Sequence, residues 1–111
     1  MGHQYVALVG ELVVGTMLVS LRGQNGLISR VAVRNDFRGR RIGTMLVDYA
    51  ENLLTHSNAQ RIDIEIYGAV EDQVTFYERG GYVETERIQR SSEEIVIMQK
   101  DLTEKPAEEE D

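Results

Sequence analysis

The pattern of apolar and polar positions along this 111-residue chain switches between two periods. Alternation with period two, typical of a strand with one buried face, is clearest where polar residues separate Ile62, Ile64 and Ile66. The sequence Gln24-Asn25-Gly26 lies between two apolar runs and is typical of a hairpin turn. Six strands are expected, at residues 5–9, 12–21, 27–33, 61–67, 82–88 and 94–99.

Two other segments repeat apolar residues every three or four positions, which is the period of an α-helix. The later one begins near Val70 and ends at Gly80 or Gly81. The earlier one covers residues 42–56, and its expected apolar face contains Ile42, Met45, Leu46, Tyr49, Ala50, Leu53 and Leu54. The elements therefore follow the order β-β-β-α-β-α-β-β, which indicates a domain of the α/β (α+β) class.

A short basic loop joins the third strand to the first helix. Backbone amides at a helix start have no partner inside the helix and lie at the positive end of its dipole, so they bind phosphate well. Gly39 and Gly43 lack a Cβ and let a ligand approach the backbone closely. Because glycine and arginine are also common in ordinary strand-to-helix loops, a loop without a ligand is the alternative. Five of the twelve basic residues gather here: Arg30, Arg34, Arg38, Arg40 and Arg41.

The same loop resembles the acetyl-CoA signature of the GNAT superfamily of N-acetyltransferases, Gln/Arg-x-x-Gly-x-Gly/Ala. Arg38 fills its first position and Gly43 its last. A second segment, Phe76-Tyr77-Glu78-Arg79-Gly80-Gly81-Tyr82, is similar to that family's FYEK-x-GF motif. The resemblance runs from about residue 4 to residue 102. The order of elements is also that of the family, except that its usual first strand and helix pair are missing.

The resemblance implies a mixed, mostly antiparallel central sheet of about six strands flanked by two helices. It also implies an acyltransferase that moves the acetyl group of acetyl-CoA to the amine of a small molecule or peptide. Amides near Ala32 and Val33 would polarise the thioester carbonyl, and Tyr77 would protonate the departing thiolate. Without the resemblance, Tyr77 is better interpreted as a core aromatic. The residues expected to bind the cofactor are Val31, Ala32, Val33, Arg38, Gly39, Arg40, Arg41, Ile42, Gly43 and Thr44.

Three positions differ from the family's pattern. Arg41 replaces its middle glycine, Val70 replaces an asparagine seven residues before the tyrosine, and Ser29 replaces a glutamate four residues before Val33. A second function class therefore stays open, namely a non-catalytic acyl-CoA-binding or regulatory module on the same scaffold.

The group that would accept the amine proton is not identifiable from the sequence. Glu65 and Asp63 lie on the strand at residues 61–67, where carboxylates facing solvent more often only increase solubility. His56 ends a helix, where a histidine is usually a partner of the helix dipole. With two histidines and no cysteine, neither a metal site nor a thiolate nucleophile is expected.

The net charge of −7 is unevenly distributed. Residues 101–111 hold six acidic residues and one lysine, which leaves about −2 on the first hundred residues, so no nucleic-acid surface is expected. We expect one domain at residues 1–102 and a disordered acidic tail at residues 103–111. Neither a signal peptide nor a membrane span is expected, which makes a cytoplasmic location the default. A small core with an uncovered sheet edge favours a homodimer.

Overall fold

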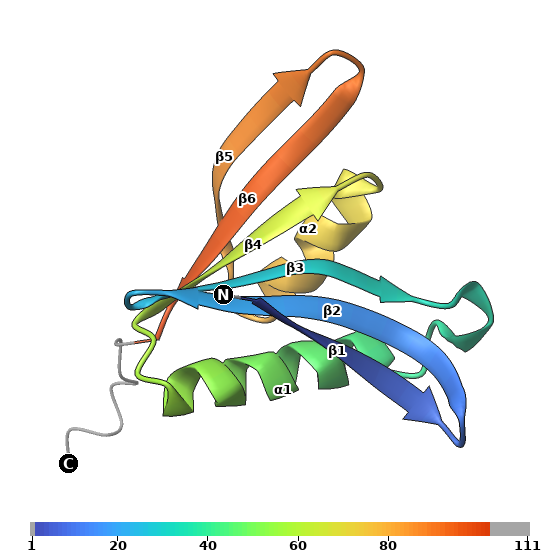
Figure 1. Cartoon of the computed structure of the whole chain (residues 1–111). Helices are drawn as coiled ribbons and strands as arrows, with labels where there is room; N and C mark the ends of the chain where they lie inside the picture. The colour runs from blue at the N-terminus through green and yellow to red at the C-terminus, as the bar shows by residue number, and fades with distance from the viewer. Residues whose placement is uncertain (1, 103–111) are drawn as a thin grey trace.

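The computed structural model describes residues 2–102 (Figure 1). The predicted order of elements is confirmed, and each strand ends within three residues of its expected position. The predicted acidic tail, residues 103–111, lies outside the described residues. The elements are β1 (Gly2–Val9), β2 (Leu12–Arg22), β3 (Asn25–Val33), a 3₁₀ turn (Asn35–Phe37), α1 (Ile42–His56), β4 (Arg61–Tyr67), α2 (Val70–Arg79), β5 (Val83–Arg90) and β6 (Glu93–Asp101).

All six strands form one sheet in the order β1-β2-β3-β4-β6-β5. Every neighbouring pair is antiparallel except β3 and β4, which are parallel because the chain crosses over through α1 between them. Figure 1 shows the two halves of this sheet, β1–β3 and β4–β6–β5, spreading apart like a fan. The predicted mixed, mostly antiparallel sheet is confirmed.

The hairpin between β2 and β3 turns earlier than predicted. Arg22 pairs with Asn25, so the two turn residues are Gly23 and Gln24, and Gly23 has φ +62°. Gly26 is a glycine for another reason: a Cβ there would lie 2.7 Å from a methyl carbon of Leu54. The glycine therefore allows the close approach of α1 to β3 instead of forming the turn.

Both helices pack on the same face of the sheet. α1 contacts β2 and β3, whereas α2 contacts β4, β5 and β6. The three isoleucines of β4 are almost fully buried on this face, as the period-two pattern predicted. They join one core with side chains from both helices, including Leu46, Ala50 and Val74. Within residues 2–102, no helix covers the opposite face.

The apolar stripe of α1 is wider than the surface on which it packs. Ile42, Leu46, Ala50 and Leu54 are buried against the sheet, as the helical period predicted. Val47, which lies outside the predicted stripe, is also buried, and it lies on the side of α1 that faces α2. Two members of the predicted stripe, Met45 and Tyr49, are 65% and 53% exposed.

The parallel pairing of β3 and β4 stops halfway along both strands. It joins Asn25–Ile28 to Arg61–Ile64 and goes no further. Just beyond, β3 contains a bulge, because two of its residues, Arg30 (φ +55°) and Val31, oppose one residue of β2. Residues 29–33 and 65–67 therefore diverge and open a gap in the middle of the sheet.

Candidate functional site

The first helix begins with free backbone donors. Arg41 precedes it with φ +64°, a left-handed conformation that costs a residue with a Cβ about 1–2 kcal/mol. That geometry explains why glycine is the usual residue at this point of the signature. No side chain caps the helix, and no acceptor among residues 2–102 binds the amides of Ile42, Gly43 and Thr44. The turn therefore has the donors that an anion requires.

The arginines of the loop have different environments. Arg34 forms two 3.0 Å hydrogen bonds to Asp36, and this contact holds the pKa of the Asp36 carboxyl below its usual range. The Nε of Arg38 donates to the carbonyl oxygen of the last residue of β3 at 3.3 Å, which folds the loop back on the strand. The guanidinium of Arg40 lies 4.8 Å from the centroid of the Phe37 ring. These contacts shape the loop before any ligand is bound.

Tyr77 lies at the centre of the molecule, on α2. Its side chain is only 3% exposed, and its ring makes edge-to-face contacts with Phe76 and Tyr82 at centroid distances of 4.9 and 5.8 Å. Burial raises the pKa of the Tyr77 hydroxyl to about 12. This hydroxyl has no hydrogen-bond partner among residues 2–102, so it is free to donate to a ligand.

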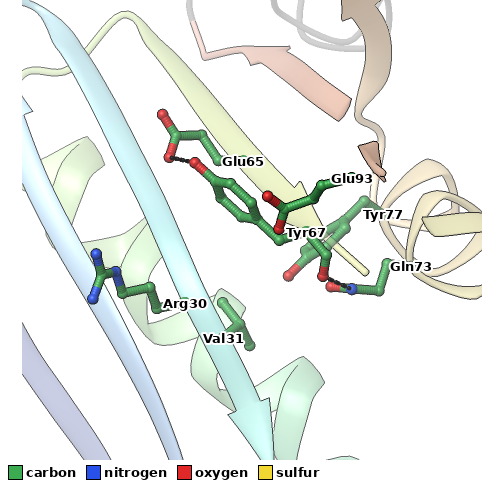
Figure 2. A pocket seen from close by; sticks show the side chains of 7 residues that line it. All are labelled: Arg30, Val31, Glu65, Tyr67, Gln73, Tyr77 and Glu93. Atoms are coloured by element: carbon green, nitrogen blue, oxygen red, sulfur yellow. Dashed lines mark hydrogen bonds between the residues drawn. The ribbon is translucent and has the colours of Figure 1, made fainter. Parts of the chain in front are cut away.

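Two hollows meet at Tyr77. The first, which we call the helix-side groove, has a volume of about 400 Å³ and is lined by Arg41, Thr44, Val47, Asp48, Phe76 and Tyr77, among others. It therefore runs from the first turn of α1 to the tyrosine. The second, which we call the gap pocket, has a volume of about 450 Å³ and is lined by Arg30, Val31, Glu65, Tyr67, Gln73, Tyr77 and Glu93 (Figure 2).

Polar contacts fix the β4 side of the gap pocket. The Tyr67 hydroxyl donates to Glu65 Oε1 at 3.2 Å, and burial together with the charge of Glu65 raises the pKa of Tyr67. Gln73 Nε2 donates to the carbonyl oxygens of Gly68 and Tyr67 at 2.7 and 3.3 Å, which ties α2 to the end of β4. In Figure 2 the Tyr77 hydroxyl points toward Val31 on the opposite side of the gap.

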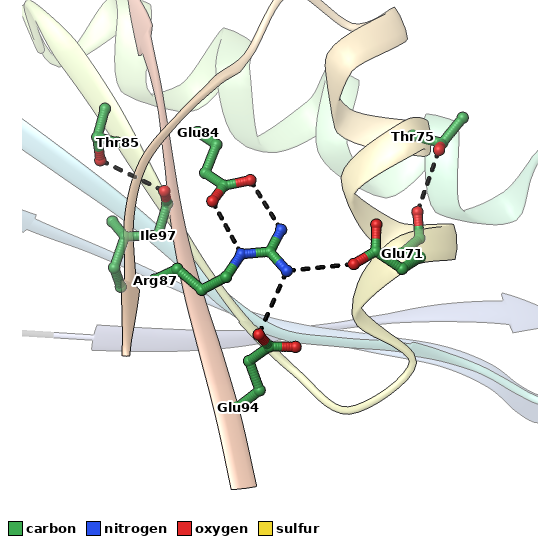
Figure 3. Close-up of polar contacts among 7 residues, drawn as sticks. All are labelled: Glu71, Thr75, Glu84, Thr85, Arg87, Glu94 and Ile97. Carbon is green, nitrogen blue, oxygen red and sulfur yellow. Dashed lines mark hydrogen bonds and ion pairs between the residues drawn. The ribbon is translucent and has the colours of Figure 1, made fainter. Parts of the chain in front are cut away.

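The hairpin β5–β6, which carries Glu93, is fastened to α2 by one arginine (Figure 3). Arg87 on β5 contacts the carboxylates of Glu84, Glu71 and Glu94 at 2.8, 3.1 and 3.3 Å. One guanidinium against three carboxylates leaves a net negative charge where the β5–β6 hairpin meets α2.

The far end of the helix-side groove is closed by a polar cluster. The Tyr82 hydroxyl donates to Glu51 Oε2 at 2.7 Å, and Lys100 Nζ lies 3.3 Å from the same oxygen. Burial and the hydrogen bond to Glu51 raise the pKa of Tyr82. This cluster joins α1 to β6 and holds the two sides of the groove at a fixed separation.

One amide of the diverging part of β3 faces the gap. The N–H of Arg34 donates to the carbonyl oxygen of Val14 on β2 at 2.8 Å. Successive amides of a strand point to alternate edges, so the N–H of Val33 points toward β4 and that of Ala32 toward β2. Beyond Ile28, the edge of β3 that faces β4 has no backbone pairing with β4.

The structure brings together only part of the predicted set of site residues. Val31, Arg41, Thr44 and Tyr77 line the two hollows. Ile42 instead belongs to the core, and only its amide is available.

Two of the three candidates for accepting the amine proton, Asp63 and His56, do not line the gap pocket, whereas Glu65 does. Asp63 pairs with Arg61 at 3.3 Å, and His56 Nδ1 lies 2.7 Å from the carbonyl oxygen of Asn52. Sequence reasoning missed Tyr67, Gln73 and Glu93. Tyr67 and Gln73 could have been found from the sequence, because they flank the junction between β4 and α2. Glu93 could not, because only the order of strands in the sheet brings it to the gap pocket.

A family model described as an acetyltransferase (GNAT) domain matches residues 1–84 of the 111. The chain belongs to the GNAT acetyltransferase family. The signature loop, residues 38–44, and Tyr77 both lie within the matched range.

Solved structures of GNAT proteins share the fold. The PaiA N-acetyltransferase of Thermoplasma acidophilum in complex with coenzyme A is 15% identical, with a TM-score of 0.77 over 90% of this chain. Ard1 of Thermoplasma volcanium is 24% identical, with a TM-score of 0.80 over 89% of this chain and 70% of its own. Naa50 of Arabidopsis thaliana, bound to a bisubstrate analogue, is 20% identical, with a TM-score of 0.79 over 89% of this chain and 72% of its own. This chain spans 60% of the length of the PaiA protein.

A search of curated proteins finds no match. Within the part of the chain that the structure describes, no helix is long and apolar enough to cross a membrane. Residues 2–102 also contain no group of three His, Cys, Asp or Glu side chains arranged to hold a metal ion.

Proposed function

We propose that this GNAT protein is an N-acetyltransferase that moves an acetyl group from acetyl-CoA to an amine. The observation that carries the proposal is the free hydroxyl of Tyr77 at the meeting point of two hollows. One hollow begins at the uncapped amides of α1, where a diphosphate fits, and the other opens through the gap in the sheet. A donor and an acceptor entering from opposite ends would meet beside the tyrosine.

The cofactor would be held by the loop and the first turn of α1. The amides of Gly39 to Thr44 would bind the diphosphate, helped by the positive end of the helix dipole. Gly39 fits this role, because nothing lies within 4 Å of the position that a Cβ would take. Arg41 lines the helix-side groove without a partner among residues 2–102, so its guanidinium is available for a phosphate.

Acetyl-CoA supplies an activated acyl carbonyl, and the chain supplies the groups around it. The N–H of Val33 faces the gap and would donate to the carbonyl oxygen as negative charge develops there. On this geometry Val33 is a better donor than Ala32, because the amide of Ala32 is directed toward β2.

Tyr77 would act as a hydrogen-bond donor to the departing sulfur and would keep its own proton. The amine would lose one proton to water before it attacks the thioester carbon, and the second proton, lost as the amide forms and the C–S bond breaks, would pass through water to the thiolate. Its pKa is about 12, so full transfer to a thiolate whose thiol has a pKa near 8.5 would cost about 5 kcal/mol. A short hydrogen bond stabilises the developing charge without that cost. Because burial raises the pKa of Tyr77 to about 12, kcat should show no loss from ionisation of this group up to about pH 10.

The amine would approach from the face of the sheet that lacks helices. Glu65 and Tyr67 lie on that side of β4, and Figure 2 shows Glu93, at the start of β6, to the right of the Tyr67 ring. The two carboxylates that line the pocket outnumber its one cation, Arg30, and this excess favours a positively charged amine through Coulomb attraction. Glu65 is the carboxylate nearest to Tyr67 and is the residue we assign to contact the ammonium group.

The competing function is a CoA-binding module without turnover. It is favoured by Ser29, a residue that is 5% exposed and offers no carboxylate at the position where many members have glutamate. Calorimetry with acetyl-CoA tests binding, and release of the free thiol in the presence of a diamine or a lysine peptide tests transfer. Binding with thiol release supports the enzyme, and binding without release for every amine supports the module. No binding contradicts both.

A further inference from the structure

Gln73 on α2 has one end of its side-chain amide occupied and the other end free. Its Nε2 donates to the carbonyl oxygens of Gly68 and Tyr67 at 2.7 and 3.3 Å, and Figure 2 shows the second of these bonds. Only the NH₂ group of an amide can donate to two carbonyl oxygens, so these contacts fix which end of the amide is nitrogen. The free end is therefore the oxygen Oε1, which is a hydrogen-bond acceptor.

This free oxygen belongs to a side chain that lines the gap pocket. No donor among residues 2–102 binds Oε1. The oxygen is accessible, because within that range only Arg61 and Asp63 have buried polar side-chain atoms that lack a partner. Gln73 also precedes Tyr77 by one helical turn on α2, a spacing that places Cβ atoms about 5–6 Å apart. An unpaired acceptor and an unpaired donor thus border the same pocket.

The other polar side chains of the gap pocket are ions or phenols. Glu65 and Glu93 are anions, Arg30 is a cation, and Tyr67 donates its hydroxyl proton to Glu65. A carboxylate in contact with an amine favours the ammonium form and raises the pKa of the amine. An alkyl amine with a pKa of about 10.4 is roughly 0.4% neutral at about pH 8, and each further unit lowers that share tenfold. A carboxylate at the reacting nitrogen would therefore suppress the form that attacks.

We propose that Gln73 is a catalytic residue, whose Oε1 accepts a hydrogen bond from the neutral acceptor amine. This assignment rests on the proposed acetyl transfer. An uncharged carbonyl oxygen holds the N–H and leaves the nitrogen lone pair free to attack, without the preference for the ammonium ion that a carboxylate has. As the N–C bond forms, the nitrogen becomes positive and its N–H becomes a stronger donor. The hydrogen bond is therefore stronger in the transition state than in the ground state.

Gln73 takes no proton in this step. Of the three protons of a primary ammonium ion, one is lost to water before attack and one as the amide forms and the C–S bond breaks. The third is the one that Gln73 holds, and it becomes the N–H of the product amide. The attacking nitrogen and the departing sulfur share one carbon in the transition state, so the residues that contact them must be neighbours, as Gln73 and Tyr77 are. The two bonds from Nε2 fix the amide before the substrate arrives.

Two substitutions separate this role from support of the junction between β4 and α2. Both Gln73→Met and Gln73→Glu lose the two donated hydrogen bonds, so both carry the same structural defect. Gln73→Met should lower kcat about 10–100-fold and leave the pH of half-maximal kcat unchanged. Gln73→Glu places a carboxylate beside the amine and should raise that pH by about one unit. A purely structural role would lower kcat in both variants without moving the profile.

The probe is acetyl-CoA with a short diamine, measured from about pH 6 to about pH 10 by thiol release. In a diamine the charge of one ammonium group lowers the pKa of the other amine, which brings the midpoint into this range. Gln89→Glu is the matched control. Its side-chain amide also donates to a backbone carbonyl, that of Ser91, but it does not line the gap pocket, so kcat and the profile should stay unchanged.

Two results would overturn the assignment, namely an unchanged kcat in Gln73→Met and a Gln73→Glu profile that falls without moving. A wild type that transfers nothing to any amine would contradict the proposed function, and this assignment with it. Should both variants fail to fold, the wild type in complex with CoA and the diamine decides. The ¹³C signal of the Gln73 side-chain carbonyl should move when neutral diamine binds, while that of Gln89 stays constant. Equal shifts, or none, would contradict the hydrogen bond.

Discussion

The two sides of the proposed site, one for the cofactor and one for the acceptor, are built in different ways. On the proposed cofactor side, the loop and helix start form one continuous segment, residues 38–44, and the amides of residues 42–44 are free because a helix begins there. On the acceptor side, the residues are far apart in the chain. Glu65 and Tyr67 come from β4, Gln73 from α2 and Glu93 from the tip of a hairpin. Tyr77 borders both sides.

This difference means that the two sides respond to change differently. A contiguous motif fixes its own geometry through local backbone conformation, so its ligand is constrained as soon as the motif exists. The acceptor side depends on strand order, on the divergence of β3 from β4, and on the Arg87 contacts that fix the hairpin. If the proposed function is right, a change in any of these would alter acceptor binding without altering cofactor binding. Substitutions can therefore separate the two sides.

The largest expected effect comes from the residue shared by both sides. Tyr77→Phe removes the hydrogen-bond donor to the departing sulfur and should lower kcat about 10²–10³-fold. The Kd for acetyl-CoA should not change, because the ring and its edge-to-face contacts remain. Thiol release at steady state measures kcat, and calorimetry measures the Kd for acetyl-CoA. Tyr49→Phe, which removes an exposed hydroxyl from α1, is the matched control. Equal kcat for the two variants would remove Tyr77 from the chemistry.

Burial of the same tyrosine predicts a loss of stability in alkali. The folded-state pKa of Tyr77 is about 12, above the ordinary value of 10, so the unfolded chain ionises first as pH rises. Its contribution, up to about 3 kcal/mol, is fully present below pH 10 and lost as pH rises through about 12. Tyr82, whose pKa is also raised, adds a loss in the same direction.

Denaturant unfolding from about pH 9 to about pH 12 measures this slope. Tyr77→Phe has no phenol to ionise, so its stability should fall less steeply over that interval than the stability of the wild type. Parallel curves for the two proteins would mean that Tyr77 is not buried in solution.

The acceptor side alone should respond to Glu65→Gln. The neutral amide keeps the shape of the side chain but loses the attraction to an ammonium group, so KM for a charged amine should rise about tenfold. The Kd for acetyl-CoA should stay constant, because Glu65 does not line the helix-side groove. Glu86→Gln, on the β5 edge, removes the same charge away from the pocket and should leave KM unchanged. An equal rise of KM in both variants would mean that the overall charge of the protein, and not a contact with Glu65, attracts the amine.

The same contrast explains what the sequence predicted well and what it did not. The order of strands and helices follows from local periods, as the alternating isoleucines of β4 illustrate. The sequence showed that Arg41 departs from the family's signature, but it did not show that the φ of Arg41 is left-handed. The turn assigned to residues 24–26 was wrong because Gly26 serves the approach of Leu54, a contact between elements distant in sequence. Glu93 was missed for the same reason, since only strand order brings it to the pocket.

The smallest expected effect concerns the cofactor side, where Arg41→Gly restores the usual residue of the signature. Glycine adopts φ +64° without strain, so the free energy of unfolding should rise by about 1 kcal/mol or less, after the greater entropy of the unfolded glycine is counted. The guanidinium lines the groove, and its loss should weaken acetyl-CoA binding about fivefold, more at low salt than at high salt. Arg34→Gln, at an arginine already bound to Asp36, is the control and should leave the Kd unchanged. Tighter binding by Arg41→Gly would mean that the side chain obstructs the diphosphate. The positive charge that binds the diphosphate would then have to come from Arg38 or Arg40.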